Sequence, residues 1–263
     1  MRTIFITGGA SGIGRAVALK FAAQGWFVGI GDIDAAGMAE TCRLIGTDQA
    51  FTTLLDVRDR AAWDAALAGF AAAAGGIDVL FNNAGIPLGG ALVDCAAEEI
   101  ERTLDINLKG VIFGAQAAYP YLRARAPGSC LLNTASAAGI YGVPGGSVYS
   151  ATKFGVRSIT ESLDGEWADD GIAVRDLMPS FIETPLLDIA PNRKSNESIR
   201  ARVGHAGMGI TPVAEVAEAA WAAVHGTRLH TTVGKDAKSL AFAARFMPGA
   251  IRKRVRSSGR PLG

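Results

Sequence analysis

The sequence has few of the residues that hold metals or form disulfide bridges. Its 263 residues include three cysteines and three histidines, and no two cysteines form a C-x-x-C pair. The odd, sparse set of Cys42, Cys95 and Cys130 argues against a disulfide framework and indicates a reducing compartment. The scattered histidines show no metal-ligand spacing. We therefore predict that the protein binds no metal.

An excess of charge and a long apolar run are also missing. Lys and Arg number 26 against 25 Asp and Glu, so the formal net charge of +1 gives no reason to expect nucleic acid as a partner. No run of about 18 apolar residues occurs, and the apolar stretch near the N-terminus is too short for a signal-peptide core. These absences predict a cytoplasmic protein with no transmembrane segment.

Short apolar runs alternate with helical patterns along the chain, which is 49% hydrophobic and long enough for one large core. Runs rich in Val, Ile, Leu, Phe and Thr predict buried strands at 3–8, 27–32, 50–56, 77–85, 129–136 and 172–179, with a short further candidate at 230–234. Helical patterns cover 15–24, 100–125, 149–168 and 213–225. We predict an α/β fold in one domain, 1–263: a doubly wound, Rossmann-like parallel sheet of about seven strands with helices on both faces.

A glycine-rich loop, ITGGASGIGRAVA, follows the first predicted strand and opens a helix. Gly8, Gly12 and Gly14 would permit a tight turn and let the backbone approach a pyrophosphate at the unpaired N–H groups of the helix N-terminus. With Ser11 and Ile13 between them, these residues form a predicted dinucleotide-binding loop. The alternative is a strand–helix turn that binds no ligand.

The second predicted strand ends at Asp32, where an acidic residue can meet the adenosine ribose hydroxyls. A carboxylate there repels a 2′-phosphate, and neither Ile33 nor Asp34 would attract one. The sequence therefore predicts NAD as the cofactor, in preference to NADP. Either aspartate could instead cap the next helix, and for Asp34 we favour the cap.

The stretch SAAGIYGVPGGSVYSATKFG contains Ser136, Tyr149 and Lys153. Tyrosine has an ordinary pKa of about 10, too high for a base near neutrality. Lys153 lies one helical turn from Tyr149, and its charge, helped by that of a nicotinamide ring, would favour the tyrosinate. Ser136, at a strand end, would hold a substrate oxygen. The stretch thus predicts proton transfer at a secondary alcohol or ketone while a nicotinamide moves the hydride.

Five motifs, in order, resemble those of the short-chain dehydrogenase/reductase family of the single-domain type. TGGASGIG is similar to the family's TGxxxGxG, NNAG at 82–85 to its fourth-strand motif, and YSATK to its YxxxK, with Ser136 thirteen residues upstream of Tyr149. Asn107 in LDINLKG matches the family's helix asparagine, and MPSFIETP resembles its PG-x-x-x-T. The resemblance covers nearly the whole chain.

The resemblance implies further roles. Asn107 holds a proton-relay water, and Lys153 also hydrogen-bonds the nicotinamide ribose. Cofactor contacts are implied at Asp56, Val57, Asn83, Ala84, Gly85, Pro179, Ile182 and Thr184. The family's usual glycine after the sixth strand is Ser180 here, which would either narrow the pocket or add a hydrogen bond. The family also implies a homotetramer or homodimer, formed through the helices predicted at 100–125 and 149–168.

Residues 136–143, including Ala137, Ile140, Tyr141 and Val143, are predicted to line the substrate pocket, with 185–209 as a lid over it. The lid begins with apolar residues and continues with charged ones, which favours an apolar secondary alcohol or ketone as substrate. The alternative is that these residues pack against the protein itself.

The tail, 245–263, has six basic residues and no acidic one, with apolar residues between them. It could touch an anionic membrane surface, bind a partner, or be solvated, and of these we favour the solvated tail. Two other functions stay open for the chain: a dinucleotide-sensing regulator without enzymatic activity and a sugar-nucleotide-modifying enzyme. The second usually needs additional chain.

Overall fold

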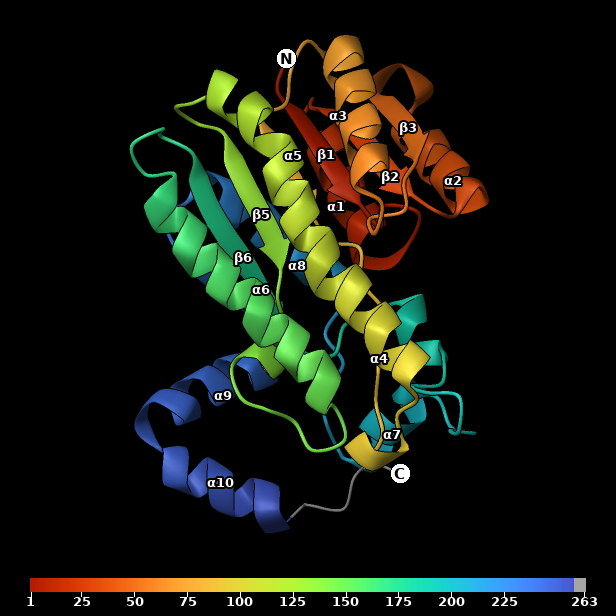
Figure 1. Ribbon diagram of the computed structural model, residues 1–263, viewed down its shortest axis with the longest axis vertical. Coiled ribbons are helices and arrows are strands. Elements are labelled where there is room, and N and C mark those ends of the chain that lie inside the picture. Colours follow the sequence, from red (N-terminus) through yellow and green to blue (C-terminus); the bar gives the residue numbers. More distant parts are fainter. Residues whose placement is uncertain (258–263) are drawn as a thin grey trace.

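The computed structural model describes residues 1–257; residues 258–263, the end of the predicted tail, lie outside the described residues. At its centre is a parallel sheet with the strand order β3-β2-β1-β4-β5-β6-β7 (Figure 1). The strands are β1 (Thr3–Thr7), β2 (Phe27–Asp32), β3 (Ala50–Leu54), β4 (Val79–Asn82), β5 (Cys130–Thr134), β6 (Ala173–Pro179) and β7 (His230–Val233). The predicted doubly wound, Rossmann-like sheet of about seven strands is confirmed.

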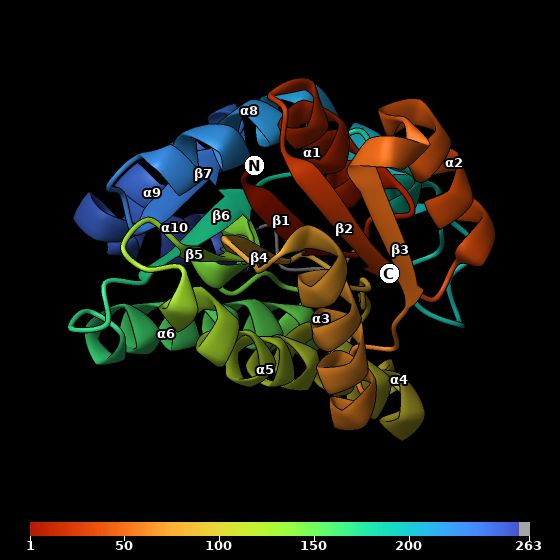
Figure 2. The same ribbon diagram turned by 90° about the horizontal axis from the view of Figure 1, so that it is seen from above.

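Helices cover both faces of the sheet, as Figure 2 shows from above. One face carries α1 (Gly12–Ala23) and α8 (Val213–His225), and the other carries α3 (Arg60–Ala74), α5 (Gly110–Ala124) and α6 (Ser147–Glu166). The other helices are α2 (Ala35–Ile45), α4 (Ala97–Leu104), α7 (Ile199–His205), α9 (Lys235–Phe246) and α10 (Pro248–Ser257). Within residues 1–257, none of the helices is long and apolar enough to cross a membrane.

Buried side chains on both faces explain why the strands read as continuous apolar runs. In β1, Ile4 and Ile6 pack into the core cluster beneath α1 and α8, whereas Phe5 packs into the cluster beneath α3 and α5. All three are fully buried. A strand whose alternate side chains are both covered needs apolar residues at every position.

The predicted helix 100–125 is present but is not a uniform α-helix. It begins earlier, as α4 at Ala97, and passes through a π-helical turn at Asp105–Lys109 before continuing as α5. Such a turn inserts one residue into the helical register. Here it turns Asn107 into the interior, where that residue is fully buried.

The predicted strands 50–56, 77–85 and 129–136 extend too far at their carboxyl ends, because β3, β4 and β5 stop at Leu54, Asn82 and Thr134. The residues beyond those ends form loops. The chain leaves β1 toward β2 and β3 on one side and continues to β4 on the other. A sheet with such a reversal binds ligands outside the carboxyl ends of its strands.

Candidate active site

A cavity of about 630 Å³ lies at the carboxyl ends of the strands, a volume typical of small-molecule sites. Most of the predicted site residues line it: Gly8, Ser11, Gly12, Ile13, Asp32, Ile33, Asp56, Val57, Asn83, Ala84, Gly85, Ser136, Tyr149, Lys153, Pro179, Ile182 and Thr184. Gly14 and Asn107 are not part of the lining. The structure therefore brings together residues from segments far apart in the sequence.

The glycine loop connects β1 to α1 at one end of this cavity. Gly8 and Gly12 have φ angles of 68° and 52°, which favour glycine. A Cβ on Gly14 would lie 2.1 Å from the carbonyl oxygen of Gly8, so Gly14 lets α1 approach the end of β1. The first N–H groups of α1 thus lie beside the cavity, where they can bind an anion.

Asn83 holds the loop after β4 against the glycine loop. Its Nδ2 donates hydrogen bonds to the carbonyl oxygens of Thr7, at 3.0 Å, and Gly8, at 3.3 Å. The Thr7 hydroxyl accepts from the backbone N–H groups of Asn83 and Ala84. The Asn83 side chain therefore positions the segment from Asn83 to Gly85 from inside the protein.

Asp32 and Asp34 have different roles. The Asp32 carboxylate accepts hydrogen bonds from the N–H groups of Ala10, at 3.0 Å, and Asp34, at 3.1 Å. Asp34 is the N-cap of α2, accepting from the N–H of Gly37 at 3.0 Å, so its predicted capping role is confirmed. Ile33 beside them is 69% exposed.

Asp56 and Val57 line the same end of the cavity from the loop after β3. The Asp56 carboxylate accepts charge-assisted bonds from Nε and Nη2 of Arg58, and these hold the pKa of Asp56 below its ordinary value. Val57 is buried, and its carbonyl accepts from Trp63 Nε1 at 3.0 Å. The loop is therefore fixed at both residues.

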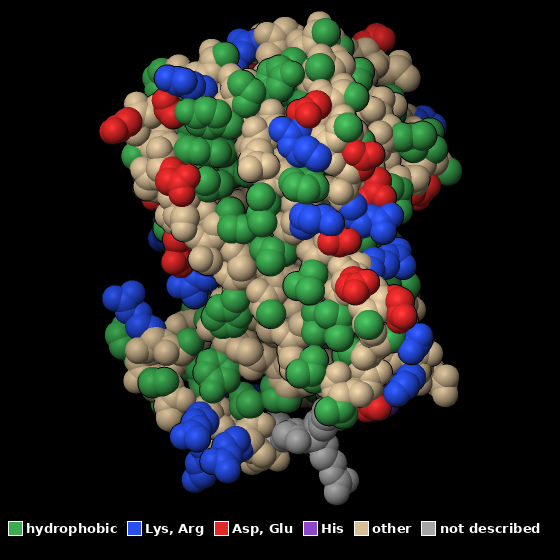
Figure 3. Space-filling view, in the orientation of Figure 1, with side chains coloured by type: hydrophobic (Ala, Val, Ile, Leu, Met, Phe, Trp, Pro, Cys, Tyr) green, Lys and Arg blue, Asp and Glu red, His purple; other side chains and the backbone are tan. Residues whose placement is uncertain are grey.

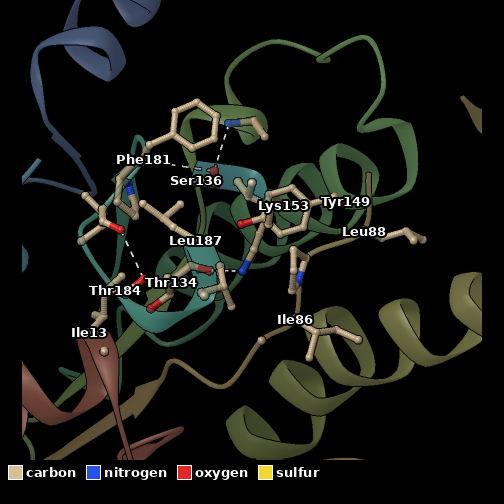
Figure 4. A pocket seen from close by; sticks show the side chains of 18 of the residues that line it. Ile13, Ile86, Leu88, Thr134, Ser136, Tyr149, Lys153, Phe181, Thr184 and Leu187 are labelled. Carbon is tan, nitrogen blue, oxygen red and sulfur yellow. Dashed lines mark hydrogen bonds between the residues drawn. The ribbon is translucent and has the colours of Figure 1, made fainter. Parts of the chain in front are cut away.

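Tyr149 and Lys153 lie together on α6 (Figure 4). Lys153 Nζ lies 5.7 Å from the centroid of the Tyr149 ring and donates to the carbonyl oxygen of Thr134 at 2.8 Å. Burial lowers the pKa of Lys153 to about 8. Burial also raises the pKa of Tyr149, while a hydrogen bond with the Ser136 hydroxyl acts in the opposite direction. Burial thus opposes the charged form of both side chains.

Ser136 follows β5, with its hydroxyl buried near the end of β6. Its Oγ accepts from the N–H of Ala138 at 3.1 Å and donates to the carbonyl of Pro179 at 3.5 Å. These contacts hold the Ser136 hydroxyl in the cavity that Tyr149 also lines.

Asn107 lies behind this group. Its Oδ1 accepts from the N–H of Ile86, and its Nδ2 donates to the carbonyl of Ile86, both at 2.8 Å. A Cβ placed on Gly85 would lie 3.3 Å from Asn107 Oδ1 and 3.8 Å from Lys153 Nζ. The π-helical turn thus places the buried Asn107 amide close to Lys153.

Ser180 lines the cavity, but its hydroxyl lies against the end of β7. Its Oγ is 3.5 Å from Thr211 Oγ1, and a Cβ on Gly234 would lie 2.4 Å from it. The side chain that replaces the family's usual glycine thus occupies space left free by another glycine.

The other end of the cavity is mostly apolar. Its lining includes Ile86, Leu88, Val143, Phe181, Leu186, Leu187, Val203, Met208 and Leu240. Ala137 and Val143 lie where they were expected. Ile140 instead packs against a small core cluster containing Val156 and Met178, and Tyr141 is not part of the lining, so the prediction for these two was wrong.

Three loops over this apolar end are tied together by backbone hydrogen bonds. The N–H of Gly89 donates to Pro191, at 2.9 Å, and that of Gly90 to Gly145, at 2.8 Å. The segment 185–209 also contributes Arg202, a buried cation that donates to Ser195 Oγ at 2.5 Å. Sequence reasoning missed Leu88, Arg202 and Leu240, because no motif marks them.

The lining fits a nicotinamide dinucleotide. The glycine loop offers positive-φ backbone and helix N–H groups, and a Cβ on Gly12 would already meet Thr184 at 3.3 Å. An acidic side chain stands at the end of β2, and the cavity continues from there to Tyr149 and Lys153. The polar groups that such a cofactor requires are therefore present along one continuous cavity.

Known proteins with similar sequences include dehydrogenases. The family model for short chain dehydrogenase matches residues 2–194. A 2-dehydro-3-deoxy-L-rhamnonate dehydrogenase (NAD(+)) from Sphingomonas sp. (strain SKA58) is 35% identical over 80% of this chain and 83% of its own length. A 3-alpha-(or 20-beta)-hydroxysteroid dehydrogenase from Mycobacterium bovis is 37% identical over 72% of each chain.

Among solved structures, a short chain dehydrogenase/reductase from Burkholderia phymatum in complex with NAD is 25% identical. It superposes with a TM-score of 0.85, covering 96% of this chain and 95% of that one. Residues 2–194, which the family model matches, contain the glycine loop, Asn107, Ser136, Tyr149 and Lys153. The chain belongs to the short-chain dehydrogenase/reductase family of oxidoreductases.

Proposed function

We propose that this protein is an NAD-dependent oxidoreductase that interconverts an apolar secondary alcohol and its ketone. The observation that carries the proposal is the convergence of Ser136, Tyr149 and Lys153 in one cavity with the glycine loop at its other end. The bound cofactor supplies the hydride acceptor or donor. The chain's residues bind the two reactants, hold the reacting oxygen and move its proton.

Tyr149 is the proposed acid/base. In the oxidation direction, the phenolate oxygen of Tyr149 takes the hydroxyl proton while the carbon loses its hydride, and the alcohol becomes a ketone. The Ser136 hydroxyl holds the substrate oxygen and stabilises its developing negative charge. Burial alone raises the pKa of Tyr149, so a nearby positive charge has to offset it.

Lys153 supplies that positive charge and binds the nicotinamide ribose. Because its pKa is about 8, Lys153 can gain or lose a proton at a pH near neutrality. Asn107 holds the water through which this proton exchanges with solvent. Pro179, Ile182 and Thr184 would contact the nicotinamide end. Asp56, Val57, Ala84 and Gly85 would contact the adenosine end.

The preference for NAD rests on Asp32. Its carboxylate is fixed by two backbone N–H groups at the end of β2, where it can accept hydrogen bonds from ribose hydroxyls. A 2′-phosphate would meet its negative charge.

The apolar lining supports an apolar substrate. Leu88 is nearly fully buried, as are Leu187 and Val203 of the lid 185–209, and all three line the cavity. Of the relatives compared, one is named for a steroid and one for a sugar acid. Arg202 is the group that could favour an acid, but its guanidinium already donates to Ser195 and lies 3.7 Å from a Glu197 oxygen.

The decisive experiment is oxidation of a panel of secondary alcohols, aliphatic to steroid-sized, with NAD⁺, by the wild type and by Tyr149→Phe. We expect turnover of apolar members and a roughly 10³-fold lower kcat in the variant. NAD⁺ affinity, measured by quenching of protein fluorescence, should change less than about threefold. Binding of NAD⁺ without turnover of any alcohol would instead favour a dinucleotide-sensing regulator.

We also propose that the protein is cytoplasmic and forms a homotetramer or homodimer through α4, α5 and α6. Leu104, Ile112 and Phe154 on these helices are between 36% and 39% exposed, which is consistent with a covered face in an assembly. Light scattering coupled to size-exclusion chromatography tests the assembly, and a monomer would contradict it.

A further inference from the structure

The C-terminal helices α9 and α10, residues 235–257, form a strongly basic surface that we call the basic arm. It contains the basic residues Lys235, Lys238, Arg245, Arg252, Lys253, Arg254 and Arg256. Its acidic residue, Asp236, accepts a hydrogen bond from the N–H of Gly209 and lines the cavity. Figure 3 shows Lys and Arg side chains over this region at the lower left, with no Asp or Glu among them.

Helix α9 has two distinct faces. Ala237 is fully buried and Leu240 lines the cavity, so this face packs on the protein. Phe242 and Phe246, one turn apart, are 61% and 62% exposed. At 100° per residue, Lys238 and Arg245 fall on the same outward side as the two phenylalanines. The outward face thus combines large apolar and basic side chains.

Helix α10 extends this pattern. Ile251 is its buried anchor, while Met247 in the turn before it is 51% exposed. Arg252, Lys253 and Arg256 are exposed, and within residues 1–257 none of them forms an ion pair. Apolar groups flanked by basic ones on an exposed helix are typical of elements that lie in a bilayer interface.

We propose that the basic arm docks the protein on an anionic lipid surface. Phe242, Phe246 and Met247 would enter the headgroup region, while the basic side chains contact the lipid phosphates. A second copy of the chain is a poorer occupant, because it would bring the same positive charge to the contact. The sequence alone favours a solvated tail here, but the ordered helix α10 and the exposed phenylalanines point to a surface.

Docking would also bring the cavity close to the lipid. The inward face of α9 lines the cavity through Asp236 and Leu240, while its outward face would lie on the bilayer. An apolar alcohol dissolved in the membrane would then be concentrated near the site. This last consequence rests on the proposed function, whereas docking itself does not.

The test is co-sedimentation of the full chain with vesicles of phosphatidylcholine alone and of phosphatidylcholine mixed with phosphatidylglycerol. We expect partition onto the anionic vesicles only, weakening as salt rises. Arg252→Glu with Lys253→Glu should lower that partition at least about 30-fold. Phe242→Ser with Phe246→Ser should lower it about tenfold.

The matched control reverses two exposed basic residues outside the basic arm, Arg43→Glu with Arg228→Glu, which should change partition less than about twofold. Unchanged NAD⁺ affinity shows that each variant is folded, whatever its activity. Equal binding to both vesicle types, or insensitivity to both arm variants, overturns the proposal. The proposal is also overturned if the arm variants lose oligomer mass but still bind vesicles, because a second copy of the chain would then be the partner that covers the basic arm.

Discussion

The two ends of the cavity are built in different ways. At the cofactor end, backbone groups and short polar side chains are fixed by hydrogen bonds, as for Asp32 to Ala10 and Asn83 to Thr7. At the substrate end, apolar side chains such as Leu88 and Leu187 come from loops that are joined to one another by surface contacts, such as the hydrogen bond from Asn192 Nδ2 to the carbonyl of Gly89. The first end can bind one ligand shape precisely, while the second can change its lining without changing the fold.

Lys153, between the two ends, should show the largest effect. Lys153→Met removes the charge proposed to lower the pKa of Tyr149, and we expect kcat to fall about 10³-fold. The same variant should be more stable than the wild type near neutral pH. Burial lowers the pKa of Lys153 from 10.5 to about 8, which corresponds to roughly 3 kcal/mol against the folded state below pH 8.

The pH dependence follows from the direction of that shift. Below pH 8 the folded and unfolded states both carry the proton, so the full penalty applies. Between pH 8 and 10.5 the folded state loses its proton first, and the wild type gains stability relative to Lys153→Met. Thermal unfolding of both proteins from pH 6 to 10 measures the difference, and a gap that widened with pH would contradict the burial argument.

Gly14 tests the rigidity of the cofactor end. In Gly14→Ala the new methyl group would meet the carbonyl oxygen of Gly8, so α1 has to move away from β1. We expect NAD⁺ affinity, measured by titration calorimetry, to fall at least about 100-fold, with lower stability. The matched change at the substrate end, Leu186→Ala, should raise KM for the alcohol and leave that for NAD⁺ unchanged. If both variants lowered the affinity for NAD⁺ equally, the two ends of the cavity would not differ in rigidity as described.

Asp32 sharpens the comparison through specificity. Replacing Asp32→Ser together with Ile33→Arg removes the repelling carboxylate and adds a guanidinium that can pair with a 2′-phosphate. The ratio of kcat/KM for NAD⁺ over NADP⁺ should fall about 100-fold. Asp34→Ala is the control: it removes the α2 cap, costing about 1 kcal/mol of stability, and should leave the ratio unaltered.

The smallest effect is expected at Ser180. Because its hydroxyl lies against Gly234 and Thr211, Ser180→Gly should change kcat and both KM values less than about threefold. A tenfold change in KM for NAD⁺ would show that this serine contacts the nicotinamide.

Sequence alone predicts the cofactor end better than the substrate end. Gly8, Gly12, Tyr149 and Lys153 are recognisable because each motif lies within one strand–helix unit, where spacing fixes geometry. The cap at Asp34 was predictable for the same reason.

Leu240 was not predictable, because only tertiary packing brings α9 to the cavity. Arg202 lies within the predicted lid at 185–209, but nothing in the sequence marks its side chain as part of the lining. The wrong placement of Ile140 has a related cause. It lies shortly after β5 and Ser136, where the short turn at Ala137–Gly139 directs it into the core. The π-helical turn at Asn107 carries no pattern that separates it from an ordinary α-helix.

The segment after β6 touches both ends of the cavity. Near its start, Thr184 packs against Gly12 of the glycine loop, and farther along, Leu187 and Val203 cover the apolar end. Any shift of this segment that favours one ligand must alter the free energy of binding the other. Linkage makes this coupling reciprocal, so the affinity of the protein for its alcohol and for its dinucleotide should change by the same factor when both are present.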